Sequence, residues 1–281
     1  MESTCPLWSS RPVSDFGILS NVVRPAFYRP LPDGRFEATG ATAGPWDPQL
    51  QHGGPPSAVL ARAMELEPSP VPQRLTRMTV EIMRPVPVGP LTVTVQTVRP
   101  GRRVAMLEAS GSVEGVECLR ARGWKIELPS KPGPVLAFPG PIPPLPKSGV
   151  ETAWPGAYVD GYMGAIEWRP TSGSLNEPGP AEVWARPRLP LLEGEPTSAF
   201  CRVAILADSG SGVGLSVDPA KVFAINVDLT LTLWRELPGE WIFMSARMAS
   251  APTGAGIAET ALGDADGIAG LALQTLLIAG R

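Results

Sequence analysis

The stretch WDPQLQHGGPPSAVLARAMEL, residues 46–66, carries the pattern that decides the fold. From residue 58 onward only Arg62 and Glu65 are polar, so a helix here would be apolar on nearly every side. A helix of that kind is stable only when other elements bury it. The stretch therefore predicts a helix enclosed by a larger apolar structure.

The elements around this helix are repeated in outline further along the chain. The apolar segments SAVLARAMEL, residues 57–66, and TSAFCRVAILAD, residues 197–208, each precede what reads as four strands. Segments LTVTVQTV, residues 91–98, and DLTLTLWR, residues 228–235, alternate between apolar and polar positions, as strands with one buried face do. The glycine-containing segments SVEGVEC and GDADGIA occupy matching places and are typical of hairpin turns. Each half should therefore hold a helix with an antiparallel sheet wrapped around it.

The segment PSKPGPVLAFPGPIPPLPKSG, residues 129–149, separates the two halves and contains eight prolines. Prolines remove N–H donors and favour extended chain, so this segment is best interpreted as a linker. We predict an N-terminal domain at residues 1–130, the linker at 131–149 and a C-terminal domain at 150–281.

The composition argues against several classes of function. A net charge of −3 without a basic cluster argues against nucleic-acid binding. One histidine and three widely spaced cysteines offer too few ligands for a metal site, and we expect no cofactor. The cysteine pattern fits a reducing, cytoplasmic setting. The first twenty residues lack a signal-peptide pattern. The sequence also lacks a run of about 18 apolar residues, which is the length that a membrane span needs.

Several motifs, in their order and duplication, resemble the double hotdog fold of the acyl-CoA thioesterase II family, over roughly residues 30–281. The N-terminal half carries QHGG ahead of the buried helix, then RPVPVGPL. The C-terminal half carries ILADSG, INVDLTLTLWRELPGEWI and GLALQTLLI. The resemblance implies an α+β fold, with two antiparallel sheets each wrapped around a long central helix. It also implies hydrolysis of acyl-CoA in fatty acid metabolism. Because hotdog sheets have exposed edges and commonly join, we expect a homo-oligomer.

The catalytic group of that family is an Asp, a Ser or Thr, and a Gln, which together hold the attacking water. By the resemblance these positions fall on Asp208, Asn226 and Gln274. Asn226 departs from the pattern, since an amide can orient water but cannot act as a nucleophile. Asp208 would accept the proton of the water that the two amides position. The plainer alternatives are a helix stop for Asp208, a strand-entry residue for Asn226 and a solvent-facing strand residue for Gln274.

In the same family the start of a hotdog helix lies beside the thioester. We therefore expect free N–H groups at the start of the first helix to face the acyl carbonyl, with His52, Gly53 and Gly54 as candidate substrate-binding residues. Pro55 and Pro56 favour a helix start at this point. The plainer alternative is that the glycines, which lack Cβ, only let the helix pack tightly against the sheet.

Two further functions on the same fold stay open. Asp47 and His52 stand five residues apart, a spacing like that of the Asp/His pair in hotdog enoyl-CoA hydratases. However, DPQLQHGG lacks the Asn-Pro-x-His context of that family. A non-catalytic acyl-CoA binding protein is the other alternative, and the departure at Asn226 is its support.

Overall fold

The computed structural model describes residues 26–131, 133–134, 136, 140–149 and 156–280. The first twenty residues, Cys5 and parts of the predicted linker therefore lie outside the described residues, as does the start of each predicted domain.

The N-terminal half contains the helix expected from the opening stretch, followed by four long strands. Before that helix come two short strands and a single 3₁₀ turn. The elements are β1 (Tyr28–Pro30), β2 (Phe36–Ala38), η1 (Gly40–Thr42), α1 (Gly54–Leu66), β3 (Gln73–Ile82), β4 (Pro90–Arg99), β5 (Val104–Val113) and β6 (Val116–Glu127).

The C-terminal half repeats this order, with a helix again followed by the main strands. The elements are α2 (Tyr162–Ala165), β7 (Ile166–Ser172), β8 (Ala181–Pro187), α3 (Ala199–Ala207), α4 (Gly210–Val213), β9 (Val222–Asn226), β10 (Asp228–Leu233), β11 (Ile242–Ser250), β12 (Ala255–Asp264) and β13 (Gly267–Gly280). The prediction of four strands after the helix is wrong here, because β9 and β10 are separated at Val227.

All the strands named above join in one antiparallel sheet, in the order β1-β2-β4-β5-β6-β3-β10-β13-β12-β11-β8-β7, with β9 also paired to β13. The two sheets that we expected are therefore continuous. Strands β3 and β10 form the seam between the halves, where Thr79 pairs with Thr230. The buried leucines of β10 alternate with half-buried threonines, as its sequence predicts.

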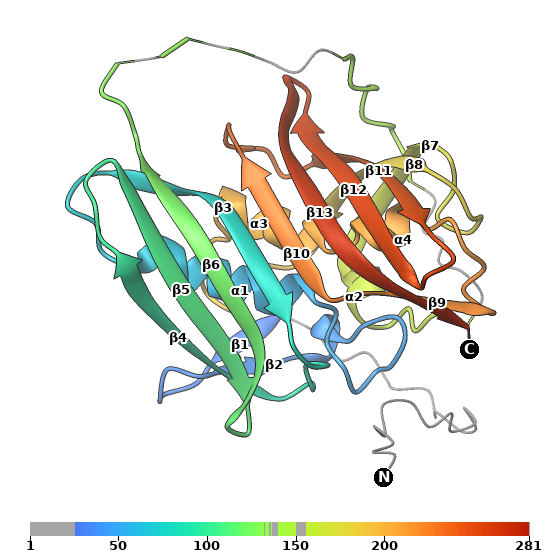
Figure 1. Cartoon of the computed structure of the whole chain (residues 1–281), viewed down its shortest axis with the longest axis horizontal. Coiled ribbons are helices and arrows are strands. Elements are labelled where there is room, and N and C mark those ends of the chain that lie inside the picture. The colour runs from blue at the N-terminus through green and yellow to red at the C-terminus, as the bar shows by residue number, and fades with distance from the viewer. Residues whose placement is uncertain (1–25, 132, 135, 137–139, 150–155, 281) are drawn as a thin grey trace.

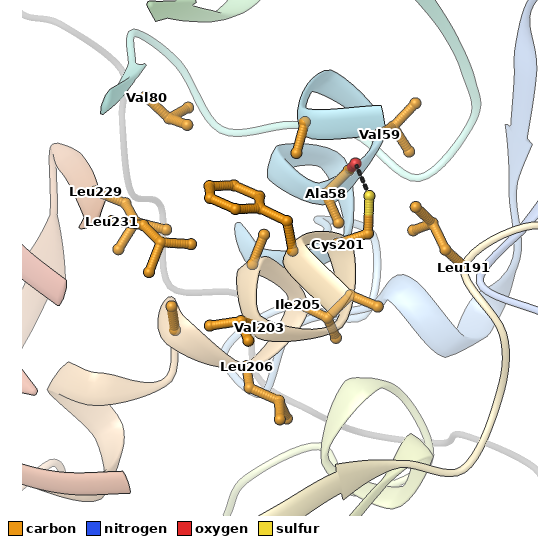
Figure 2. Close-up of a cluster of buried hydrophobic side chains, with 14 of the residues drawn as sticks. Ala58, Val59, Val80, Leu191, Cys201, Val203, Ile205, Leu206, Leu229 and Leu231 are labelled. Atoms are coloured by element: carbon orange, nitrogen blue, oxygen red, sulfur yellow. Dashed lines mark hydrogen bonds between the residues drawn. The ribbon is translucent and has the colours of Figure 1, made fainter. Parts of the chain in front are cut away.

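Helices α1 and α3 lie against each other on one face of this sheet (Figure 1). They span 13 and nine residues, so neither is the long helix that we expected in each half. Their contact forms the centre of the apolar core, where Ala58 and Val59 of α1 lie near Cys201 and Ile205 of α3 (Figure 2). The Cys201 thiol donates a hydrogen bond to the Ala58 carbonyl oxygen at 3.4 Å.

The proline-rich segment follows β6, which ends at Glu127. Its described residues 140–149 are attached to the C-terminal half. The Trp184 indole donates to the Pro143 carbonyl oxygen at 3.0 Å, and the Arg169 guanidinium donates to that of Pro146 at 2.7 Å. In the described part of the chain, no helix has both the length and the apolar character needed to cross a membrane.

Candidate active site

A cavity of about 350 Å³ opens between the two halves of the chain. His52 and Gly53 line it from the N-terminal half, and Asp208 and Asn226 line it from the C-terminal half. Most of the remaining wall is apolar, and it includes Trp46, Leu50, Ile82, Met163, Trp168, Leu175, Val213, Ile225 and Leu277. The cavity thus combines a small polar group with a larger apolar surface, as ligand sites commonly do.

Asp208 directly follows the last residue of α3 and is only 4% exposed. Its Oδ1 accepts a hydrogen bond from Asn226 Nδ2 at 2.7 Å. Gln274 Nε2 donates to the Asp208 main-chain oxygen at 2.9 Å and lies 3.4 Å from Oδ1. The fold therefore brings together three residues that are far apart in the sequence.

Asn226 reaches Asp208 because β9 and β10 are joined by a β-bulge. Asn226 pairs with Leu276 of β13, whereas Thr230 pairs with Leu273, so the five residues 226–230 face only four residues of β13. Strict alternation would place Asn226 on the same face as Thr230, away from the helices. The extra residue at Val227 reverses the side on which Asn226 points.

Gln274 is 2% exposed, so the solvent-facing alternative for it is wrong. Its Oε1 accepts a hydrogen bond from the Ser211 N–H at 2.8 Å, while its Nε2 donates to Asp208. Both ends of the amide are thus engaged within the protein, and Gln274 is not among the residues that line the cavity. Gln274 therefore contacts Asp208 without itself lining the cavity.

His52 lies on the other side of the same carboxylate. Its Nδ1 is 3.2 Å from Asp208 Oδ2 and accepts a hydrogen bond from the Gly54 N–H at 3.1 Å. Nδ1 therefore faces both a main-chain N–H and a carboxylate oxygen, and these two contacts favour opposite tautomers of the neutral ring. Burial lowers the pKa of His52, and the nearby Asp208 carboxylate opposes that shift.

Tyr162 holds the His52 ring in place, and no motif in the sequence indicated it. The two rings are stacked, with centroids 3.7 Å apart and planes at 3°. The Tyr162 hydroxyl donates to the Ile205 carbonyl oxygen at 2.8 Å and lies 2.8 Å from Ser209 Oγ. Burial raises the pKa of this hydroxyl far above its usual value, so it stays protonated as a donor. Tyr162 is recognised as part of the site only through this stacking contact, because it is far from His52 in the sequence.

The glycine pair does allow close approach, but the neighbour is the second helix rather than the sheet. A Cβ on Gly54 would lie 2.1 Å from the Ile205 carbonyl oxygen of α3. A Cβ on Gly53 would lie 2.8 Å from Asp208 Oδ2. Both residues must therefore lack a side chain for α1, α3 and the Asp208 carboxylate to come together.

The expectation of several free N–H groups at the start of α1 is wrong. The Gly54 N–H donates to His52 Nδ1, and the two prolines that follow have no N–H. The Ser57 N–H donates to the Gly53 carbonyl oxygen at 3.2 Å. Among the described residues, no acceptor is hydrogen-bonded to the N–H of Gly53, a residue that lines the cavity.

Asp47 also lines the cavity, but it does not pair with His52 in the described part of the chain. Its Oδ1 accepts a hydrogen bond from the Gln49 N–H at 2.8 Å. The carboxylate beside His52 is that of Asp208 instead. The Asp47–His52 pair required by the hydratase alternative is therefore not formed.

The N-terminal half contains a counterpart of the Asp208 group. Thr79 of β3 and Thr230 of β10 pair across the seam. On their other sides, β3 pairs with β6 and β10 pairs with β13. Thr79 pairs with Arg122 and Thr230 pairs with Leu273. The next residues along β6 and β13 are Gly123 and Gln274, which therefore correspond. A register shift at Thr76 in β3 also corresponds to the bulge in the C-terminal half.

The counterpart is apolar and filled. Leu75 precedes Thr79 by four residues, as Asn226 precedes Thr230. Met64, near the end of α1, takes the place of Asp208. A Cβ on Gly123 would lie 2.5 Å from the Met64 sulfur and 2.8 Å from Leu75 Cδ1. Of these two corresponding positions, only the one in the C-terminal half carries polar groups.

Family models match both halves of the chain. The acyl-CoA thioesterase N-terminal domain matches residues 42–126, and the acyl-CoA thioesterase C-terminal domain matches residues 141–278. The chain belongs to the acyl-CoA thioesterase family. This confirms the family expected from the sequence. A search of curated proteins finds no match.

Several solved structures resemble this acyl-CoA thioesterase family member in fold, although their sequence identity to it is low. A conserved protein of unknown function with a hotdog fold from Alicyclobacillus acidocaldarius has a TM-score of 0.68 at 16% identity, covering 88% of this chain and 92% of that one. The tesB protein of Mycobacterium avium subs paratuberculosis has a TM-score of 0.60 at 14% identity, covering 82% and 88%. The acyl-CoA thioesterase II TesB2 of Mycobacterium marinum has a TM-score of 0.57 at 16% identity, covering 74% and 82%. These likenesses establish the hotdog fold.

Proposed function

We propose that this protein hydrolyses the thioester of acyl-CoA to a free acid and CoA, using a water molecule held by Asp208 and Asn226. The observation that carries the proposal is the buried Asp208 carboxylate, which has Asn226 Nδ2 at 2.7 Å and forms part of the wall of a largely apolar cavity. A carboxylate in such a place can accept a proton from water close to a bound acyl group.

In the proposed reaction, Asn226 Oδ1 and the Asp208 carboxylate hold the attacking water. Asp208 takes one proton as the water oxygen bonds to the thioester carbon. The negative charge that forms on the carbonyl oxygen is stabilised by the Gly53 N–H. When the carbon–sulfur bond breaks, the proton held by Asp208 passes to the departing thiolate. Asn226 needs no nucleophilic hydroxyl in this scheme.

Gln274 acts in this proposal as a positioning residue. Its amide is fixed by Ser211 on one side and donates to Asp208 on the other. It therefore fixes the backbone at Asp208 and adds a longer contact of 3.4 Å to Oδ1, the carboxylate oxygen that also faces Asn226. Gly54 supports His52 in the same indirect way, because its N–H contacts His52 Nδ1 at 3.1 Å.

The test is incubation of the purified protein with saturated acyl-CoAs and enoyl-CoAs of several chain lengths. Release of free thiol, lost in Asp208→Asn, supports hydrolysis. Loss of enoyl absorbance without thiol release would indicate a hydratase instead. Tight retention of intact acyl-CoA without either change would indicate a binding protein. A role in fatty acid metabolism, a cytoplasmic location and a homo-oligomeric state stay predictions from the sequence.

A further inference from the structure

The cavity has a buried apolar end and an exposed rim. Trp168 and Val213, at the buried end, are 3% and 2% exposed. Met83 and Leu277, on the rim, are 48% and 52% exposed. An acyl chain is most stable in the buried apolar end, since that end removes it from water. The thiol part of a thioester would then extend toward the rim. This inference rests on the function proposed above.

Among the described residues that line the cavity, Arg84 is the only Lys or Arg, and it is exposed. In the described part of the chain its guanidinium has neither a carboxylate partner nor a hydrogen bond. Arginines elsewhere are often paired, as Arg62 is with Glu195 and Arg235 with Asp264. The Arg84 guanidinium is thus available to an anionic ligand.

The backbone around Arg84 is fixed beside the candidate catalytic group. The Ile82 N–H donates to the Val227 carbonyl oxygen at 2.8 Å, one residue from Asn226. The Arg84 N–H donates to the Cys118 carbonyl oxygen at 3.3 Å. The Gln51 N–H, next to His52, donates to the Val86 carbonyl oxygen at 2.7 Å. Arg84 is therefore held on the rim between the segment of His52 and the strand of Asn226.

We propose that Arg84 binds a phosphate of the thiol part of the substrate, which is a phosphorylated pantetheine. Guanidinium groups bind phosphate oxygens through paired, charge-assisted hydrogen bonds. Coenzyme A and the phosphopantetheine arm of a carrier protein share this phosphate. The two acidic residues of the wall, Asp47 and Asp208, would repel it, which leaves Arg84 as its charged partner in the wall.

The test compares thioesters that carry the same acyl group on coenzyme A, on 4′-phosphopantetheine, on pantetheine and on N-acetylcysteamine. For Arg84→Gln we expect KM to rise about tenfold with the first two thiols and to change little with the last two, which lack phosphate. Added salt should raise KM of the parent for coenzyme A thioesters and have less effect on the variant. A rise confined to coenzyme A would place the contact on a phosphate that 4′-phosphopantetheine lacks and would overturn the assignment to the shared phosphate.

The matched control is Arg103→Gln, an exposed arginine at the turn between β4 and β5 that is not part of the cavity wall. It should leave all four KM values unchanged. Equal losses of Arg84→Gln on all four thioesters, or a kcat effect without a KM effect, would overturn phosphate binding. If the parent hydrolyses none of them, calorimetric titration with coenzyme A decides. Weaker binding by Arg84→Gln than by Arg103→Gln supports the proposal, and equal or absent binding rejects it.

Discussion

Asn226 Nδ2 lies 2.7 Å from Asp208 Oδ1, and the bulge at Val227 places it there. The contact joins the end of a helix to a strand of the sheet that covers it. It also determines which lone pairs of Asp208 remain available, because Oδ1 is occupied by Asn226 while Oδ2 faces His52 and Gly53.

Asp208→Asn should lower kcat for acyl-CoA hydrolysis by roughly 10²- to 10⁴-fold, the usual contribution of a general base. The replacement has nearly the same shape, so the fold should be retained. Thiol release measures the loss, and circular dichroism and the thermal unfolding midpoint check the fold. A variant that hydrolyses acyl-CoA as fast as the parent would exclude Asp208 as the base.

Asn226→Asp should shift the acid limb of the pH–rate profile to higher pH. A second carboxylate would stand where Asn226 Nδ2 now lies, 2.7 Å from Asp208 Oδ1, so the two acids would share a proton and their apparent pKa would rise. A base must be deprotonated, and activity near neutral pH should therefore fall. Asn226→Thr is the uncharged control and should keep or raise activity, because it supplies the hydroxyl of the family pattern. An unshifted acid limb in Asn226→Asp would contradict the contact.

Gly54→Ala should destabilise the protein by roughly 1–3 kcal/mol, the usual cost of overpacking. The added Cβ would lie 2.1 Å from the Ile205 carbonyl oxygen and would force α1 and α3 apart. The matched control is Gly89→Ala, where the added Cβ meets no atom within 4 Å. Urea unfolding of both variants gives the difference. Equal stabilities would mean that the two helices separate without cost.

His52 should titrate below its ordinary pKa of 6.5, because its burial disfavours the charged ring. Between the two pKa values, the unfolded chain therefore binds a proton at His52 that the folded chain does not bind. His52 should therefore reduce stability as pH falls from about 6.5 toward its folded-state pKa. It is the only histidine, so an untagged protein gives a single imidazole signal whose midpoint NMR can follow.

Two variants make the His52 prediction sharper. Asp208→Asn removes the charge that opposes the shift, so the pKa of His52 should fall further. His52→Gln should lose the stability difference between pH 7 and lower pH that this ring causes. Glu65 acts in the opposite direction, because burial raises its pKa, and comparison of His52→Gln with the parent removes its effect. A midpoint at or above 6.5 in the parent would contradict the burial of the ring.

The sequence predicted the repeated order of helix and strands well, because apolar periodicity follows from burial. It also indicated Asp208, Asn226 and Gln274, but only through the resemblance to a family. Their geometry depends on features without a local sequence signal. The bulge at Val227 reverses Asn226, although the residues around it read as one regular strand. The stacking of Tyr162 on His52 depends on tertiary contact alone.

The split between β9 and β10 shows the same limit from another side. Hydrophobic alternation fixes which face a residue occupies only while the register is unbroken, and one inserted residue exchanges the faces. The helix lengths were missed for a different reason. The apolar segments at residues 57–66 and 197–208 agree with the observed bounds of α1 and α3, whereas the long helices were implied only by the family resemblance.

Met64, Leu75 and Gly123 show what becomes possible when two halves share one chain. In a dimer of identical subunits, a polar residue needed at one position is repeated at the equivalent position of the partner. Where that second copy is buried and has no function, its desolvation lowers the stability of the folded protein. Duplication within a chain removes the constraint. One half can keep an acid and two amides, while the other replaces them with a thioether, a leucine and a hydrogen atom that fill the space.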